Sequence, residues 1–122
     1  MIQAQELTKR FGHFTAIQDV SFQVARGEIV GFLGPNGAGK STTMRILAGV
    51  FPPSSGRALV GGYDVVADPL RDRQVVGYFP ERVALYADLT VREYLHYVAS
   101  MKGVAVRQQA GDVAQAMEAC II

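Results

Sequence analysis

The chain has very little cysteine: Cys120 is the one cysteine among 122 residues, and tryptophan is absent. A single cysteine excludes an intrachain disulfide framework and a zinc site built from several cysteines. It favours a reduced setting such as the cytosol. The first residues lack the basic and then apolar pattern of a secretory signal. No apolar run approaches the roughly 20 residues that cross a bilayer. Any membrane association would therefore require a partner.

A strong excess of charge of either sign is also lacking. The chain has 12 Lys and Arg against 11 Asp and Glu, for a net charge of +1. It carries no basic tract with interleaved aromatic residues, so neither the charge nor the pattern favours binding to nucleic acid. The hydrophobic content of 49% and charged content of 19% are typical of a globular protein. The length suits one modest domain.

Glycine, by contrast, is plentiful, and several glycines fall in one motif. Residues 34–41, Gly-Pro-Asn-Gly-Ala-Gly-Lys-Ser, match the phosphate-binding loop pattern Gly-x-x-x-x-Gly-Lys-[Ser/Thr]. Glycines let successive backbone N–H groups turn inward into an anion nest, which the start of the following helix reinforces. Lys40 would reach the β- and γ-phosphates, and the Ser41 hydroxyl would be an oxygen ligand for Mg²⁺. The alternative is a glycine-rich turn that binds nothing.

The segments on either side favour the phosphate loop over that alternative. Residues 28–33, Glu-Ile-Val-Gly-Phe-Leu, are expected to form a short buried strand. Residues 42–48 predict a helix that Gly49 closes and that Pro52-Pro53 prevents from continuing. Strand, loop and helix therefore follow one another in the order that a phosphate loop requires.

Other elements follow from hydrophobic periodicity and from turn and cap residues. The early strands are expected to be antiparallel because their connections are short. Asp68 and Pro69 predict the start of a short helix, and Thr90 and Glu93 form a capping box at the start of a longer one that ends at Gly103. The remaining expectations are strands over residues 2–8, 16–24, 57–60 and 75–79, and a last helix over 107–119.

Taken together, these motifs resemble the ATP-binding subunit of an ABC transporter over nearly the whole chain. Within that family, the sequence is most similar to bacterial exporters of the drug-resistance or gliding-motility type, whose ATP-binding subunit pairs with separate membrane subunits. The resemblance implies an α/β fold: a P-loop NTPase core of ABC type, with an N-terminal antiparallel β region and the start of an α-helical subdomain, truncated. It implies a partial core over residues 1–88 and the start of the subdomain over 89–122. The stretches that carry it are residues 7–12, 34–42, 46–49, 55–56, 76–81 and 89–95.

The resemblance also implies roles for individual residues. Phe11 falls where the family places an aromatic ring that stacks on adenine, and a flat π-face suits a purine. The alternative for Phe11 is ordinary core packing. The metal Mg²⁺ would be held by Ser41 and Glu81. The residues that would bind the nucleotide with Phe11 are Gly34, Pro35, Asn36, Gly37, Ala38, Gly39, Lys40, Ser41 and Thr42.

Glu81 departs from the family pattern, which usually has glutamine at this position. A glutamate can hold Mg²⁺ through oxygen, but it adds negative charge beside a triphosphate and cannot donate a hydrogen bond when ionised. The alternative for Glu81 is a solvated turn residue.

Three motifs that the resemblance leads us to expect are missing from the sequence. They are a Leu-Ser-Gly-Gly-Gln-type signature, an Asp-Glu pair at the end of an apolar strand, and a switch histidine. In the family, the Asp helps to hold Mg²⁺ and the Glu acts as general base on water. We therefore expect nucleotide binding without efficient hydrolysis, assign no catalytic residue, and expect the chain to be the N-terminal portion of a longer protein.

The implied cofactors are ATP and Mg²⁺. The implied partners are a transmembrane permease subunit and a second ATP-binding subunit, at a cytoplasmic location peripheral to the inner face of the membrane. The predicted function is ATP binding that powers transmembrane export, with a contact to the permease over residues 82–92. Two alternatives stay open: a non-catalytic nucleotide-binding or interaction fragment, and a soluble ABC protein without a transport role.

Overall fold

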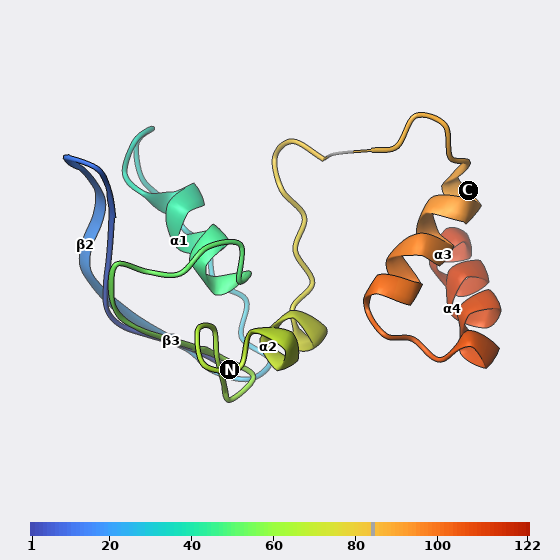
Figure 1. Ribbon diagram of the computed structural model, residues 1–122, viewed down its shortest axis with the longest axis horizontal. Helices are drawn as coiled ribbons and strands as arrows, with labels where there is room; N and C mark the ends of the chain where they lie inside the picture. Colours follow the sequence, from blue (N-terminus) through green and yellow to red (C-terminus); the bar gives the residue numbers. More distant parts are fainter. Residues whose placement is uncertain (84) are drawn as a thin grey trace. The chain divides into compact units, whose positions relative to one another are not determined.

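The computed structural model describes residues 1–83 and 85–122 (Figure 1). These residues form two compact units, Met1–Tyr78 and Phe79–Ile122. The first unit contains the β-sheet and the candidate phosphate loop, and the second is helical.

The sheet of the first unit is antiparallel throughout, with the strand order β2-β1-β3-β4. This confirms the expectation of an antiparallel β region at the start of the chain. The last strand, a two-residue pairing across a tight turn, was not expected. The strands are β1 (Ile2–Phe11), β2 (Phe14–Val24), β3 (Ser55–Val60) and β4 (Tyr63–Asp64).

The first strand contains an irregularity that shapes the core. The pairing of β1 with β2 shifts register between Ala4 and Leu7, and Glu6 there has φ 49°. Leu7 and Thr8 are consequently both buried, although neighbours in a regular strand point to opposite faces. The buried Thr8 hydroxyl donates to Asp19 Oδ1 at 3.2 Å and accepts the Asp19 N–H at 3.0 Å. The polar group that the bulge turns inward is thus satisfied.

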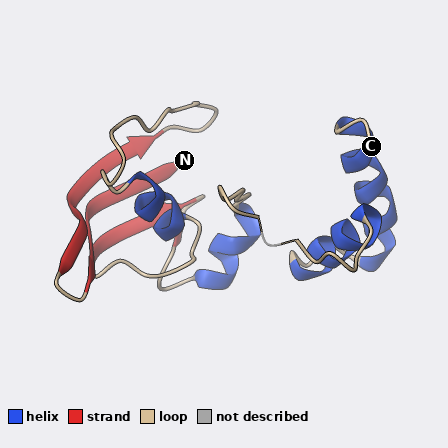
Figure 2. Ribbon diagram, turned by 90° about the horizontal axis from the view of Figure 1, so that it is seen from above, coloured by secondary structure: helices blue, strands red, loops and turns tan. Residues whose placement is uncertain are grey.

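Helix α1 (Lys40–Leu47) lies across one face of this sheet (Figure 2). Its buried residues Thr43, Ile46 and Leu47 recur at the spacing of one helical face, and they pack toward β2 and β3. The helix ends before Gly49, whose N–H donates to Ile46 O at 3.0 Å. The predicted helix is confirmed, with its start two residues earlier. The sheet side of the core consists of Ala4, Leu7, Ile17, Ala58, Val60 and Val65.

The expected strand over residues 28–33 is wrong. The segment has no regular secondary structure, and Ile29 and Leu33 are 99% and 94% exposed. Within the segment, the Phe32 ring lies 5.0 Å from that of Phe22, and Glu28 forms a turn in which its N–H donates to Ala25 O at 3.3 Å. A buried strand requires neighbours that accept and donate its backbone hydrogen bonds. In the part of the chain that the structure describes, no strand pairs with this segment, and Ile29 and Leu33 stay in solvent.

The expected strand over residues 75–79 is wrong for the same reason. Helix α2 (Pro69–Val75), which starts after Asp68 as predicted, takes in the first of these residues. The rest have no regular secondary structure and pair with no described strand, and Phe79 is 85% exposed. Apolar character alone did not produce a strand at either place.

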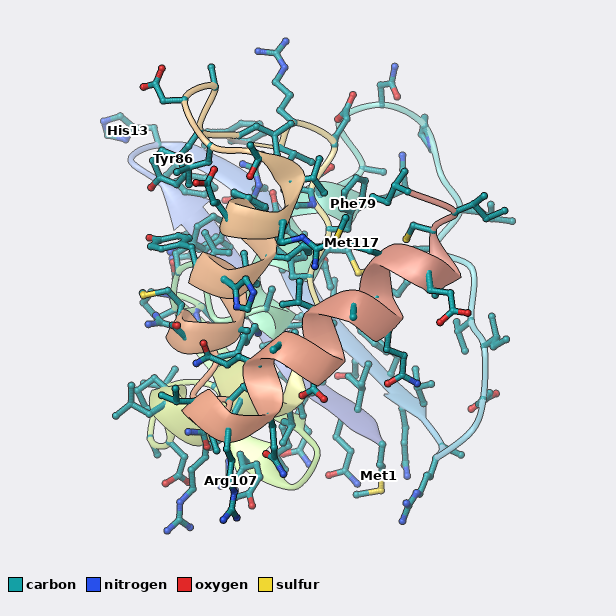
Figure 3. The ribbon with its side chains drawn as sticks, turned by 90° about the vertical axis from the view of Figure 1, so that its right-hand side faces the viewer. Met1, His13, Phe79, Tyr86, Arg107 and Met117 are labelled. Atoms are coloured by element: carbon teal, nitrogen blue, oxygen red, sulfur yellow. The ribbon has the colours of Figure 1, made fainter. Side chains whose placement is uncertain are left out.

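The second unit is a pair of helices, α3 (Val91–Met101) and α4 (Val106–Ala119), that pack against each other. Figure 3 labels Arg107 near the start of α4 and Met117 near its end. The Tyr86 ring, before α3, lies 6.4 Å from the Tyr94 ring and 5.6 Å from the Tyr97 ring. Both helices were predicted from the sequence.

The start of α3 is a complete capping box. The Thr90 hydroxyl accepts the Glu93 N–H at 3.3 Å, and the Glu93 carboxylate accepts the Thr90 N–H at 2.8 Å and its hydroxyl at 2.7 Å. These hydrogen bonds, from the Thr90 hydroxyl first and its backbone N–H second, lower the pKa of Glu93 from its ordinary value of 4.5. They favour the ionised carboxylate at the positive end of the helix.

We expect the helicity of α3 to depend on pH through Glu93. Because its pKa is lower in the folded state, the carboxylate stabilises the helix above its ordinary pKa of 4.5, and this contribution is lost as the pH falls through the folded value. Glu93→Gln should therefore be less helical than the parent at neutral pH and equal to it in acid. Far-UV circular dichroism across an acid titration checks this, with Glu118→Gln on α4 as the matched control. Parallel titrations of the parent and Glu93→Gln would contradict the prediction.

Candidate functional site

The candidate loop runs directly into the first residue of α1. Gly37 and Gly39 have φ values of 85° and 82°, and the Ala38 N–H closes a turn by donating to Pro35 O at 3.2 Å. Positive φ at these two positions is open to glycine at little cost and to other residues with strain. The sequence pattern therefore forms the kind of tight, glycine-dependent turn that an anion nest needs.

The Lys40 side chain folds back over the start of the loop. Its ammonium donates to Gly34 O at 2.5 Å and to Pro35 O at 2.7 Å. An ammonium has three N–H donors, so two loop carbonyls hold it and one donor direction is left for an anion. The positive charge is thus fixed at the mouth of the loop rather than extended into solvent.

The N-terminus of α1 is electrostatically prepared for an anion. The N-cap is Gly39, and within the described residues no side chain caps it and no acidic residue stands in its first turn. The first backbone N–H groups of a helix have no intrahelical acceptor and carry the positive end of the dipole. Together with the Lys40 ammonium, these donors present positive charge to a phosphate.

Two packing contacts that sequence reasoning missed hold the end of the loop in place. Thr43 is 1% exposed and donates to Gly39 O through its backbone N–H at 2.9 Å and its hydroxyl at 3.0 Å. On the other side, Gly39 lies against β2: a Cβ added there would stand 2.2 Å from Ile17 Cγ2 and 2.6 Å from Ala16 O. The loop is therefore seated on the sheet, and no local pattern marks the β2 residues that seat it.

Phe11 stands at the end of β1, beside the turn that joins it to β2. In Figure 1 this turn and the loop that leads into α1 lie on the same side of the first unit, and in Figure 3 the His13 side chain extends outward from the turn. Phe11 is 48% exposed, and its ring lies 5.6 Å from the Phe51 ring at an interplanar angle of 89°. It is thus neither fully packed into the core nor free of contacts.

The predicted site residues 34–42 form one continuous segment of the first unit, and Glu81 belongs to the second unit. Ser41 is exposed on the first turn of α1, and Thr42 beside it is half-buried. Both continue directly from the loop. Glu81 is exposed and belongs to the second unit, so the structure gives no site that joins it to Ser41. Among residues 1–83 and 85–122, no three His, Cys, Asp or Glu side chains cluster in a way that could hold a metal.

Comparison with known proteins identifies a family that the chain matches. The family model described as "ABC transporter" matches residues 17–120. The chain is 44% identical to the probable multidrug ABC transporter ATP-binding protein YbhF of Escherichia coli, over 98% of this chain and 21% of that protein. It is 37% identical to the linearmycin resistance ATP-binding protein LnrL of Bacillus subtilis, over 97% of this chain and 38% of that protein.

The solved structures agree with the sequence relatives. One described as the ATP-binding subunit of an ABC transporter superposes with a TM-score of 0.79 at 33% identity, covering 88% of this chain and 45% of that one. The described part of the chain contains no helix long and apolar enough to cross a membrane. The chain spans 21% and 38% of the length of the two named relatives and 45% of the length of this solved structure.

The loop, the helix it opens and the antiparallel strands beside it belong together as one known arrangement, the α/β P-loop fold of the ATP-binding cassette. The family match covers most of the chain, and YbhF and the solved structure named above are described as ATP-binding proteins of ABC transporters. This chain belongs to the ABC transporter family, as part of its ATP-binding domain.

Proposed function

We propose that residues 34–42 bind the phosphates of ATP, and that this binding serves an ATP-driven exporter. The observation that supports it most directly is the position of Lys40, held by two loop carbonyls at the uncapped start of α1. A lysine in this position presents a point charge to the β- and γ-phosphates, and the backbone N–H groups of the loop and of the first helical turn surround their oxygens. Thr42 lies near the α-phosphate in this proposal.

The residues present also suit Mg²⁺. The Ser41 hydroxyl is a hard oxygen donor, is exposed, and stands one position after the lysine that reaches the terminal phosphates. When bound, Mg²⁺ would supply positive charge that offsets the negative charge of the phosphates. Ser41 would hold the ion, and Glu81 would be its second protein contact. Ser41 belongs to the first unit and Glu81 to the second.

Phe11 is the proposed contact for the adenine base. About half of its ring surface is open, which a stacking platform requires and a core residue does not. The phosphates and the base would then be bound by two different parts of the first unit, the α1 loop and the end of β1.

We propose a role in transport for a longer protein, similar to the named relatives, that would contain this chain. Two of them are described as a multidrug transporter protein and a linearmycin resistance protein, which favours export. The proposed partners are a transmembrane permease, contacted through residues 82–92, and a second ATP-binding subunit, at the cytoplasmic face of the membrane. Residues 1–88 would belong to the nucleotide-binding core, and residues 89–122 to the helical subdomain.

For the residues present here we propose binding rather than turnover. The sequence contains the phosphate loop but no Asp-Glu pair after an apolar strand, no signature and no switch histidine. Phosphoryl transfer depends on positioning the attacking water and on stabilising the charge that develops. Without the groups that do this, the loop would hold a nucleotide without hydrolysing it efficiently.

Calorimetry with ATP, in Mg²⁺ and in chelator, tests the proposal together with an assay of phosphate release. We expect the 122-residue chain to bind ATP more tightly with Mg²⁺ and to release phosphate at the background rate. Ser41→Ala should lose about ten-fold or more in affinity with Mg²⁺ and little in chelator, because it removes one metal ligand.

The control for this variant is Ser100→Ala, which removes a serine hydroxyl from α3 in the other unit and should change neither affinity. An unaltered Mg²⁺ effect in Ser41→Ala would remove Ser41 from the metal site. Turnover at ordinary enzyme rates would overturn the proposal of binding without hydrolysis.

A further inference from the structure

A lysine and two aromatic rings form a small cluster at the end of β1, made of Lys9, Phe11, Phe51 and Pro52. The Lys9 ammonium lies 5.2 Å from the centre of the Phe11 ring and 4.8 Å from the centre of the Phe51 ring. It also donates to Pro52 O at 2.6 Å. The cluster joins the first strand to the segment after α1, more than forty positions later in the chain.

The Lys9 cluster restrains side chains that would otherwise move. A lysine at a strand end ordinarily samples many rotamers, because its stem is flexible and its head is well hydrated. Here the carbonyl of Pro52 and two ring faces hold the ammonium at one place. Phe51 is half-buried against the core, and its ring is perpendicular to that of Phe11. The Phe11 ring is therefore held by a cation and by an anchored ring while 48% of its surface stays open.

Such an arrangement resembles a stacking platform more than a packing site. A ring that must stack on a planar base binds more tightly when its orientation is set beforehand, since less freedom is lost on binding. A cation near a π-face draws on the electron density of the ring, which favours stacking with an electron-rich heterocycle on the open side. Neither effect reaches the phosphates, which the α1 loop binds.

We propose that Lys9 and Phe51 are positioning residues that hold the Phe11 ring in place to stack on the base of a bound nucleoside triphosphate. The inference rests on the proposed function, in which Phe11 contacts the adenine. It assigns the base-dependent part of the affinity to the Lys9 cluster and the phosphate-dependent part to Lys40 and its loop.

The test compares two ligands that differ only in whether a nucleoside is present. The dissociation constants of Mg·ATP and of Mg·tripolyphosphate are measured by calorimetry on the 122-residue chain and its variants. Phe11→Ala should weaken ATP binding by about ten-fold, in the range known for stacked bases. Lys9→Met, which keeps the stem without the charge, and Phe51→Leu should each weaken it by about three-fold. Tripolyphosphate binding should change in none of them.

A double-mutant cycle shows whether Lys9 acts through Phe11. Once Phe11 is alanine, adding Lys9→Met should weaken ATP binding no further, because no ring remains to be positioned. Lys9→Arg should restore most of the ATP affinity, since it keeps a cation over the rings. Arg10→Met is the matched control: it removes a positive charge from the next residue of β1 and should leave both constants unchanged.

The outcomes distinguish failure of the positioning role of Lys9 from failure of the proposed nucleotide binding. If the parent binds neither ligand, the proposed function fails and the inference fails with it. If both ligands bind but Lys9→Met weakens them equally, Lys9 is a phosphate contact and the positioning role is overturned. An ATP-specific loss in Lys9→Met that persists in the Phe11→Ala background would also overturn it, because Lys9 would then contact the nucleoside directly.

Discussion

Replacement of Lys40 by alanine is expected to weaken ATP binding by about 100-fold, a factor typical of losing a hydrogen-bonded charge. The ammonium is the one side-chain cation that hydrogen bonds to the described loop carbonyls, those of Gly34 and Pro35. Its loss removes the charge beside the terminal phosphates and the two hydrogen bonds that shape the entrance to the loop. Lys40→Arg should fare little better, because a planar guanidinium does not replace a compact ammonium between two carbonyls.

Calorimetry with Mg·ATP measures the effect, and Lys102→Ala is the matched control. Lys102 is the C-cap of α3 in the second unit, so its replacement changes the net charge equally but leaves the loop intact. Tripolyphosphate binding should fall in parallel with ATP binding in Lys40→Ala. Unchanged affinity in this variant would refute the assignment of residues 34–41 as a phosphate loop.

Gly39→Ala is expected to lower the free energy of unfolding of the first unit by about 2–5 kcal/mol, combining the cost of a left-handed residue with that of overpacking. Its φ of 82° disfavours any side chain, and the added Cβ would collide with Ile17 Cγ2 and Ala16 O. The loop could avoid the collision only by moving away from β2, against which Gly39 packs. We therefore expect ATP binding to be lost along with the stability.

Comparison with Gly37→Ala separates the cost of the left-handed backbone conformation from the cost of overpacking. Gly37 has nearly the same φ, 85°, but an added Cβ there meets nothing within 4 Å. Its replacement should cost about 1–2 kcal/mol, from the backbone conformation alone. Urea unfolding followed by circular dichroism measures both variants. Equal destabilisation by the two substitutions would show that contact with β2 does not matter.

Elements with a strong local signal were predictable from the sequence. The capping box of Thr90 and Glu93, the Pro69 helix start and the glycine turn before Lys40 each depend on neighbours within a few positions. The hairpin of β1 and β2 followed from short connections between alternating segments. The loop residues were assigned to the candidate site from a local sequence pattern, and Phe11 from the family resemblance.

Features that depend on distant segments were not predictable. The apolar segment 28–33 has the composition of a buried strand, but whether it becomes one depends on backbone partners that no described strand supplies. The contact of Lys9 with Phe51 and Pro52 joins residues far apart in the chain, and no spacing rule could have indicated it. The same is true of the seat of Gly39 on Ala16 and Ile17.

The sequence by itself determined the phosphate loop, the helix that follows it and the family, because each rests on residue types at fixed short spacings. Tertiary structure alone decided which apolar segments are covered and how the loop and the Phe11 ring are held. The physical reason is that turns and caps satisfy their hydrogen bonds locally, whereas a strand or a ring contact needs a partner that only the folded chain brings to it.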